Sequence, residues 1–288
     1  METLVLAAAI GVLVGVVVGT LGAGGGVLTV PALVYLVGFD PHAAATASLV
    51  IVGATSLVTL VPHARRGHVR LRGGLVFGAV GAVAAVGGAW LAHLVDGPVL
   101  MAAFSVLLLG VAVLMARRAT TERRSASPEE ASEAAPEAAP ELATEAATGA
   151  VAGAVAGAEG VRRGVLVLVG LAALVGLLTG LFGVGGGFAA IPALVLALGY
   201  PVRDAVGTSL LVITVNSAAG LIARVPQGIE LDWPPVLAFA LASTIAGQLG
   251  ARLSTRASTT VLTGIFAALL AVVAVLTASR ALPALLTG

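Results

Sequence analysis

The chain has 288 residues, of which 59% are hydrophobic and only 10% are charged, and its formal net charge is +1. Soluble domains contain about 25% charged residues, because a folded surface in water needs them. The composition therefore excludes an ordinary soluble enzyme and indicates a polytopic membrane protein. The lack of cysteine excludes disulfides and thiolate chemistry, and no basic patch with interleaved aromatic residues points to a nucleic-acid partner.

Eight apolar segments are long enough to cross a hydrocarbon core about 30 Å thick. The first four lie at 3–37, 43–62, 74–94 and 98–116, and the last four at 164–198, 205–223, 235–253 and 259–278. This pattern predicts an all-α polytopic membrane protein with about eight transmembrane helices, arranged as two four-helix repeats. We place the first transmembrane repeat at residues 1–118 and the second at 161–288.

Residues 119–160 separate the two repeats and differ from them in composition. This segment is rich in Ala, Glu and Pro and contains eight glutamates. Such a composition cannot bury enough apolar surface to fold alone, so we interpret it as a flexible linker. A short acidic helix within it and a tail that recruits a partner are the alternatives.

A glycine-rich element in the first apolar segment recurs in the fifth, with every matched position related by the same offset. The matched positions are Gly15, Gly19, Gly22, Gly24, Gly25, Gly26, Pro31, Ala32 and Leu33, which correspond to Gly176, Gly180, Gly183, Gly185, Gly186, Gly187, Pro192, Ala193 and Leu194. Chance composition could supply a few glycines but not this common register. The sequence therefore indicates an internal duplication.

The first and fifth segments each contain 35 residues and would be about 52 Å long as unbroken helices, well beyond the bilayer core. A triple glycine and a following proline lie inside each segment, where they weaken or end a helix. We expect each segment to be interrupted, either as a broken span or as a re-entrant hairpin, with Pro31 and Pro192 as helix breaks.

Paired interruptions at matching positions of two repeats are typical of a transport site. A half-helix that starts at such a break directs free N–H groups and a positive dipole end at a bound anion. Candidate substrate-binding residues are therefore Gly24, Gly25, Gly26, Gly185, Gly186 and Gly187. The alternative is that glycines permit close helix packing, an interpretation that we prefer for the Gly15–Gly19 and Gly176–Gly180 pairs.

The doubled GxxxGxxGxGGGxxxxP element, the four-plus-four plan and the basic loop after the second segment resemble the sulfite exporter TauE/SafE family. This family is also called the 4-toluene sulfonate uptake permease family. The resemblance covers both hydrophobic halves and leaves the linker outside. It implies secondary transport of a small sulfur-containing anion such as sulfite, a sulfonate or sulfoacetate, by uptake or by export.

Polar side chains within the spans are few, and each is costly in a membrane. Ser48 and Ser209 occupy equivalent repeat positions, and Asn216 is the only carboxamide in the sixth segment. Hydroxyls and amides can donate hydrogen bonds to an oxyanion without adding negative charge, so these three are further substrate-binding candidates. The alternative for the serines is a bond to a carbonyl of the preceding turn.

No acidic residue lies deep in a predicted span. Asp40 and Asp204 lie at the starts of the second and sixth segments, which we expect to face the outside, and we interpret both mainly as helix caps. The second interpretation is proton coupling through a relay with His42 or Arg203. The coupling ion, a proton or sodium, is left open.

The arginines predict the orientation, because cytoplasmic loops retain positive charge. Eight crossings place the linker and both termini in the cytoplasm, and four crossings per repeat give the two halves the same orientation in the cell membrane. The arginines assigned to the cytoplasmic side are Arg65, Arg66, Arg70, Arg72, Arg117, Arg118, Arg123, Arg124, Arg162, Arg163, Arg224 and Arg280; Arg203, Arg252 and Arg256 remain on the other side.

The sequence thus favours a secondary transporter that binds a small anion between two glycine-rich broken helices, with the lipid bilayer as its surroundings and no cofactor. An anion channel is the first alternative. An intramembrane enzyme is less favoured, because Gly-x-Ser-x-Gly, His-Glu-x-x-His and paired deep aspartates are absent from the sequence. A membrane scaffold that recruits a partner through the acidic linker is the last alternative.

Overall fold

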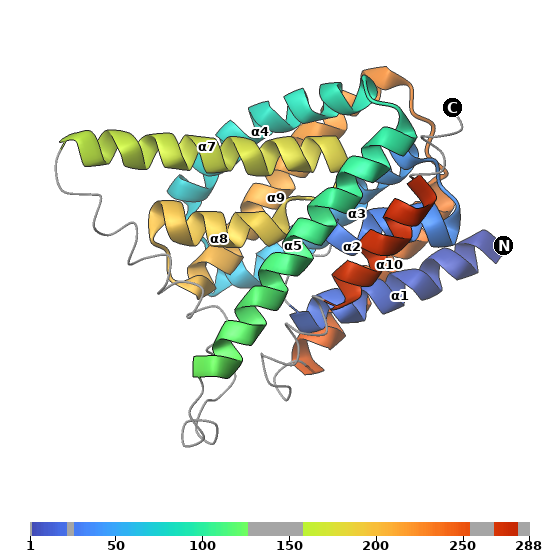
Figure 1. The fold of residues 1–288 in the computed structure, drawn as a ribbon, viewed down its shortest axis with the longest axis horizontal. Helices are drawn as coiled ribbons and strands as arrows, with labels where there is room; N and C mark the ends of the chain where they lie inside the picture. Colours follow the sequence, from blue (N-terminus) through green and yellow to red (C-terminus); the bar gives the residue numbers. More distant parts are fainter. Residues whose placement is uncertain (1, 22–25, 126–157, 254–267, 282–288) are drawn as a thin grey trace.

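The computed structural model describes residues 2–21, 26–125, 158–253 and 268–281, in which every regular element is a helix (Figure 1). The first half contains α1 (Glu2–Leu21), α2 (Gly26–Ala32), the π-helix η1 (Leu33–Val37), α3 (Pro41–Arg65), α4 (Leu71–His93) and α5 (Gly97–Ser125). The second half contains α7 (Ala158–Phe182), α8 (Gly187–Leu198), α9 (Val202–Arg224), the short 3-10 helix η3 (Val225–Gln227), α10 (Trp233–Leu253) and a helix at Ala268–Ala281. The predicted all-α class is confirmed.

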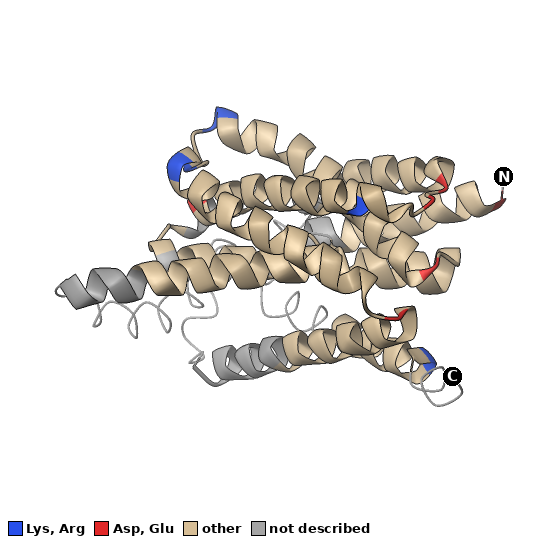
Figure 2. Ribbon diagram, turned by 90° about the horizontal axis from the view of Figure 1, so that it is seen from above, with Lys and Arg blue, Asp and Glu red and all other residues tan. Residues whose placement is uncertain are grey.

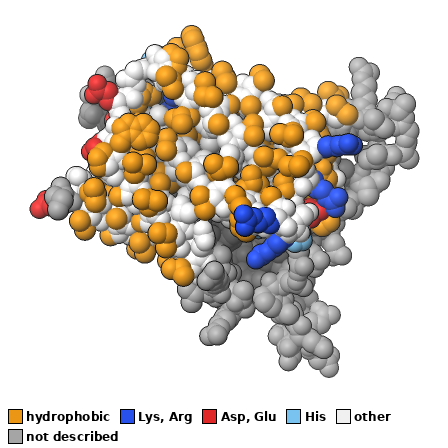
Figure 3. Space-filling view, turned by 180° about the vertical axis from the view of Figure 1, so that it is seen from behind, with side chains coloured by type: hydrophobic (Ala, Val, Ile, Leu, Met, Phe, Trp, Pro, Cys, Tyr) orange, Lys and Arg blue, Asp and Glu red, His pale blue; other side chains and the backbone are white. Residues whose placement is uncertain are grey.

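Four helices of the described ranges are long and apolar enough to cross a membrane, by length and composition. They are Pro41–Arg65, Leu71–His93, Val165–Phe182 and Asp204–Gln227. Large apolar side chains on them are exposed, including Val83 at 76% and Ile222 at 70%, and hydrophobic atoms cover much of the face drawn in Figure 3. Such a surface is unfavourable in water and fits a multi-pass membrane protein.

Helix boundaries in the two halves follow the spacing of the glycine element. The helices α2 and α8 start at Gly26 and Gly187, which are matched positions of the glycine element. The same offset separates Pro41 and Val202, where α3 and α9 start. The starts of these two pairs of helices, α2 with α8 and α3 with α9, therefore follow the offset of the glycine element.

Each interrupted segment folds as a re-entrant hairpin. The helix α7 runs beside α4 in the same direction, since a Cβ on Gly176 would meet the Gly81 carbonyl and one on Gly180 the Ala85 carbonyl. The following helix, α8, returns to the start of α4, where Leu198 and Tyr200 pack against Gly73. The chain therefore re-emerges at the end from which α7 entered.

The first half repeats this arrangement with α1 and α2. The helix α1 runs beside α10 in the same direction, because Gly11 lies against Phe239 and Gly15 against Ser243. Both α1 and α10 start at the same end of the bundle as α3. The chain therefore enters with α1 at this end, returns to it through α2 and η1, and leaves it again with α3.

The two halves have opposite orientations, which makes the predicted parallel arrangement wrong. The equivalent helices α3 and α9 are antiparallel, because Gly53 packs against Ser217 whereas Thr46 accepts a hydrogen bond from Arg224. The physical reason is that a hairpin returns the chain to its starting side. A hairpin removes one of the four crossings predicted for each half, and an odd number of crossings inverts the second repeat.

The same geometry corrects the predicted sides of the termini. The start of α1 and the end of the Ala268–Ala281 helix lie at the end of the bundle where α3 begins, as the hydrogen bond from Tyr35 to the Thr277 carbonyl shows for the latter. The end of α5 and the start of α7, which flank the linker, lie at the opposite end. The prediction that both termini share a side with the linker is therefore wrong.

Four arginines also change sides. Arg224 and Arg280 lie at the end away from the linker, whereas Arg203 and Arg252 lie at the linker end, with the basic α3–α4 loop. Figure 2 shows the basic positions gathered mainly at one end of the bundle and most acidic positions at the other. The arginines are unequally distributed between the two ends, as the prediction assumed. The observed helix directions, however, place these four arginines at the ends opposite to those predicted.

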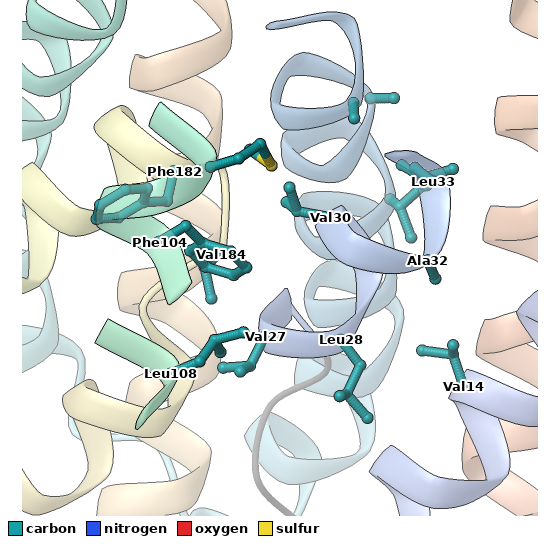
Figure 4. Close-up of a cluster of buried hydrophobic side chains, with 14 of the residues drawn as sticks. Val14, Val27, Leu28, Val30, Ala32, Leu33, Phe104, Leu108, Phe182 and Val184 are labelled. Atoms are coloured by element: carbon teal, nitrogen blue, oxygen red, sulfur yellow. The ribbon is translucent and has the colours of Figure 1, made fainter. Parts of the chain in front are cut away.

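The core lies where the two hairpins meet the crossing helices. Phe104 of α5 packs against Phe182 at the end of α7, with ring centroids 5.3 Å apart. Figure 4 shows Val27 of α2 extending toward Leu108 of α5, with Val184 of the α7–α8 connection nearby. This apolar packing joins α2, α5 and the α7–α8 connection.

Candidate functional site

The two interruptions of the chain meet each other. Gly26, the first residue of α2, is buried, and a Cβ there would overlap the carbonyl group of Val184 in the α7–α8 connection. Gly24 and Gly25 lie outside the described residues. The two interruptions are therefore in backbone contact at Gly26, whereas the binding of an anion by these glycines stays a prediction.

The α7–α8 connection depends on glycine for its backbone shape. Gly183, Gly185 and Gly186 have φ angles of 72°, 73° and 66°, in the left-handed region that other residues avoid. Gly187 then begins α8. We call residues 182–187 together with Gly26 the hairpin junction.

Helices α3 and α9 enclose the hairpin junction. A Cβ on Gly183 would overlap the Ala45 carbonyl of α3, and one on Gly185 would meet Val52 of α3 and Ile213 of α9. The backbone of the connection thus passes directly along both helices. Irregular backbone at membrane depth is tolerated where protein covers it in this way.

The prolines do not break their helices. Pro31 lies inside α2 and Pro192 inside α8, so the prediction that they end a helix is wrong. In the second half the interruption occurs at Gly183, Gly185 and Gly186, because glycine readily adopts the left-handed backbone that other residues avoid. Two residues after Pro31 the helix widens into η1, a form that tolerates a lost i→i−4 bond.

Three side chains within one helical turn of the residues that contact the hairpin junction are buried without hydrogen-bond partners. They are the hydroxyls of Ser48 and Ser217 and the carboxamide of Asn216. Ser48 lies one turn from both Ala45 and Val52, on the face of α3 that contacts the connection. Asn216 lies one turn after Ile213 on α9 and packs against Gly81 of α4.

Ser209 lies apart from this group. Its hydroxyl donates to the Val206 carbonyl at 2.8 Å, so its bonding is satisfied within its own helix. The helices α3 and α9 are antiparallel, and Gly53 contacts Ser217. Ser209, eight residues before Ser217, is therefore level with Val61, eight residues after Gly53. At 1.5 Å per residue it lies about 20 Å from Ser48 along the helix axis, so the inverted repeats keep the two serines apart.

Arg224, at the end of α9, lies beside the last turn of α7, just before the hairpin junction. The residue is 1% exposed. It donates to the Gly180 and Leu181 carbonyls at 2.7 and 3.2 Å, to the Thr46 hydroxyl at 3.1 Å and to the His42 carbonyl at 3.5 Å. A cationic side chain at the carbonyl end of α7 complements the helix dipole.

The two aspartates lie at opposite ends of the molecule. Asp40 caps α3 by accepting a hydrogen bond from the His42 amide at 2.9 Å, as predicted. Asp204 accepts from Arg70 Nε at 2.7 Å and lies 3.5 Å from His68 Nδ1. It therefore belongs to the basic α3–α4 loop at the linker end, and its predicted place at the outer end is wrong.

Comparisons with known proteins decide the family. The family model described as "Sulfite exporter TauE/SafE" matches residues 7–277. The chain belongs to the sulfite exporter TauE/SafE family. It is therefore a multi-pass membrane protein of a transporter family, which confirms the resemblance that the glycine elements indicate and accords with a function other than catalysis.

Several curated relatives of this transporter carry the same general description. A "Probable membrane transporter protein" of Xylella fastidiosa is 32% identical over 213 residues, which cover 74% of this chain and 70% of the relative. The "Probable membrane transporter protein MJ0441" of Methanocaldococcus jannaschii is 25% identical, over 77% of this chain and 72% of the relative. No solved structure matches this chain significantly.

Sequence reasoning missed the role of Arg224 and the involvement of Ser217. Because Arg224 directly follows an apolar segment, the sequence predicts that it lies in a loop on the cytoplasmic side. The available signal was the run from Ser217 through Gly220 to Arg224, which lies on one helical face. In the structure this face packs on Gly180 of α7 and Leu49 of α3.

Proposed function

We propose that this transporter is a secondary carrier of a small sulfur-containing anion, which binds at the hairpin junction. The observation that carries the proposal is the group of unpartnered polar atoms on Ser48, Asn216 and Ser217. An unpaired buried polar group costs about 1–3 kcal/mol. A ligand that bonds to these hydroxyl and amide groups would remove that cost.

Local charge supports an anion rather than a cation. Among the side chains that the structure describes, the carboxylates lie at or just outside helix ends and not beside the junction; they are those of Glu2, Asp40, Asp96, Asp204, Glu230 and Asp232. The N-terminal end of α8 starts at Gly187 and adds a partial positive charge. An oxyanion would thus meet hydrogen-bond donors and no like charge.

The sulfur-containing substrate class is proposed from the family's description as a sulfite exporter. Orientation is proposed from the arginines: the linker and the α3–α4 loop face the cytoplasm, and the start of α1 faces outward in the cell membrane. A proton or sodium gradient supplies the driving force, and the surrounding bilayer is the only other partner in this proposal.

Flux measurements in proteoliposomes test this function. We expect labelled sulfite or a labelled sulfonate to accumulate against its gradient, with saturation, when a proton or sodium gradient is imposed. Saturable accumulation separates a carrier from the channel alternative, which would only dissipate a gradient. Absence of flux for every anion tested would refute the proposal, and chemical conversion of the anion would favour the enzyme alternative.

The acidic linker is expected to be dispensable for transport. Replacing residues 126–157 by a shorter Gly/Ser linker should leave the rate unchanged, because their composition predicts a connector that contributes reach and no packing. Both helices that it joins end on the same side of the bundle. The rate in proteoliposomes, normalised to inserted protein, checks this expectation. Lost transport with normal insertion would instead indicate an active linker, as in the scaffold alternative.

A further inference from the structure

Arg224 is a buried cation without a carboxylate partner among the residues that the structure describes. The two ion pairs found there both involve Asp204, at the opposite end of α9. Outside the described residues, segments 22–25, 254–267 and 282–288 contain no Asp or Glu, whereas 126–157 contains six glutamates. Burying an uncompensated charge in a membrane protein is costly, so this position requires an explanation.

The four hydrogen bonds of Arg224 to carbonyl and hydroxyl oxygens involve its two terminal nitrogens and leave its Nε without an acceptor. The Nη1 and Nη2 atoms donate to His42, Thr46, Gly180 and Leu181. The Nε atom is buried and has no partner. A carbonyl offers only a partial charge, so neither the free donor nor the full positive charge is balanced.

The position of Arg224 links it to the proposed substrate site. Ser217, Gly220 and Arg224 follow one another on a single face of α9, and Gly220 packs against Gly180 in the last turn of α7. Arg224 therefore lies two turns from Ser217, about 10 Å along the axis. It is also the only Lys or Arg that is buried among the side chains that the structure describes.

We propose that Arg224 is the charge-pairing residue for the transported anion and that it selects a monoanionic oxoanion, such as a monosulfonate. This inference rests on the proposed function. The free Nε donates to a substrate oxygen, and one negative charge neutralises the guanidinium. A dianion leaves one charge unpaired in a site of low polarity, which weakens its binding.

Thermal unfolding of the purified full-length chain tests this selectivity with three probes of increasing charge. Dimethyl sulfone is neutral, methanesulfonate carries one negative charge, and sulfate carries two. Ligands stabilise a protein according to their concentration relative to Kd. We expect methanesulfonate to bind at least tenfold more tightly than either of the other two probes.

Variants of Arg224 separate anion binding from a purely structural role. We expect Arg224→Gln to raise the methanesulfonate Kd at least tenfold and to remove the preference over dimethyl sulfone. Arg224→Lys keeps the charge and should keep the order of preference, with weaker binding because the fork of donors is lost. Arg280→Gln, an exposed change at the same end of the bundle, should leave Kd unchanged.

A structural cap predicts a different result. If Arg224 only satisfied the end of α7, Arg224→Gln would lower the unfolding temperature without ligand but keep the preference for methanesulfonate, which would overturn the proposal. Equal binding of sulfate and methanesulfonate by the unmodified protein would also overturn it, even where a variant fails to fold. If the protein transports an anion but gives one of these two binding results, only the role of Arg224 is refuted. If it neither binds nor transports any anion, the proposed function is refuted as well.

Discussion

Replacing Gly26 by alanine is expected to reduce anion transport at least tenfold. The added Cβ would overlap the Val184 carbonyl, which is backbone and cannot move aside as a flexible side chain can. Overpacking at such a contact costs about 1–3 kcal/mol and would separate the two hairpin tips. The measurement is the initial rate of sulfonate or sulfite uptake in proteoliposomes, normalised to inserted protein.

A matched control for Gly26→Ala exists in α4. Gly87 has no atom within 4 Å of the Cβ that alanine would add, so Gly87→Ala introduces the same methyl group without a collision. It should transport at the unmodified rate. Uptake by Gly26→Ala at the rate of the Gly87→Ala control would disprove a role for the contact between the hairpins.

Replacing Gly176 by alanine is expected to destabilise the protein, by about 1–3 kcal/mol. Its added Cβ would overlap the Gly81 carbonyl, where the backbones of α7 and α4 touch. Small residues at this spacing permit close approach of membrane helices. The loss should appear as a lower midpoint of thermal unfolding in detergent, with no ligand present.

Gly170 provides the comparison for Gly176 on the same helix. It is exposed, and a Cβ there would have no neighbour within 4 Å. Gly170→Ala should leave the unfolding midpoint unchanged or raise it slightly, because alanine is the better helix former. Equal midpoints for the Gly170 and Gly176 variants would show that the α4–α7 contact contributes nothing to stability.

The polar candidates show how far local sequence reasoning extends. Asp40 immediately precedes Pro41 and caps α3, because capping requires only residues adjacent in sequence. Asp204 has a similar place in its repeat, yet its carboxylate pairs with Arg70, which lies far earlier in the chain. A local pattern predicts a local bond, whereas a partner from another helix is decided by packing.

The serines give the same lesson within a repeat. Ser48 and Ser209 are equivalent in sequence, but Ser209 bonds within its helix while Ser48 has no partner beside the junction. Their separation follows from the inversion of the second half. Equivalence in sequence therefore predicts equivalent environments only if the orientation of the repeats is known.

The sequence by itself determined the membrane class, the helical content, the duplication and the positions of the glycine interruptions. These properties depend on composition, on apolar length and on the constant offset between the two glycine elements, all of which are local or periodic. Backbone freedom at glycine likewise belongs to the residue itself, which explains why the break lies at Gly183–Gly186.

The tertiary structure alone decided whether each interrupted segment crosses the bilayer or returns. Apolar length has no direction, and a span and a hairpin can have the same composition. Contacts between distant segments, such as α7 with α4 and Gly26 with Val184, select the hairpin. That choice changes the number of crossings, inverts the second half, and moves Arg224 from a predicted cytoplasmic loop to the interior. The apolar composition that indicates a membrane protein is the same whether the segment spans the bilayer or folds as a hairpin.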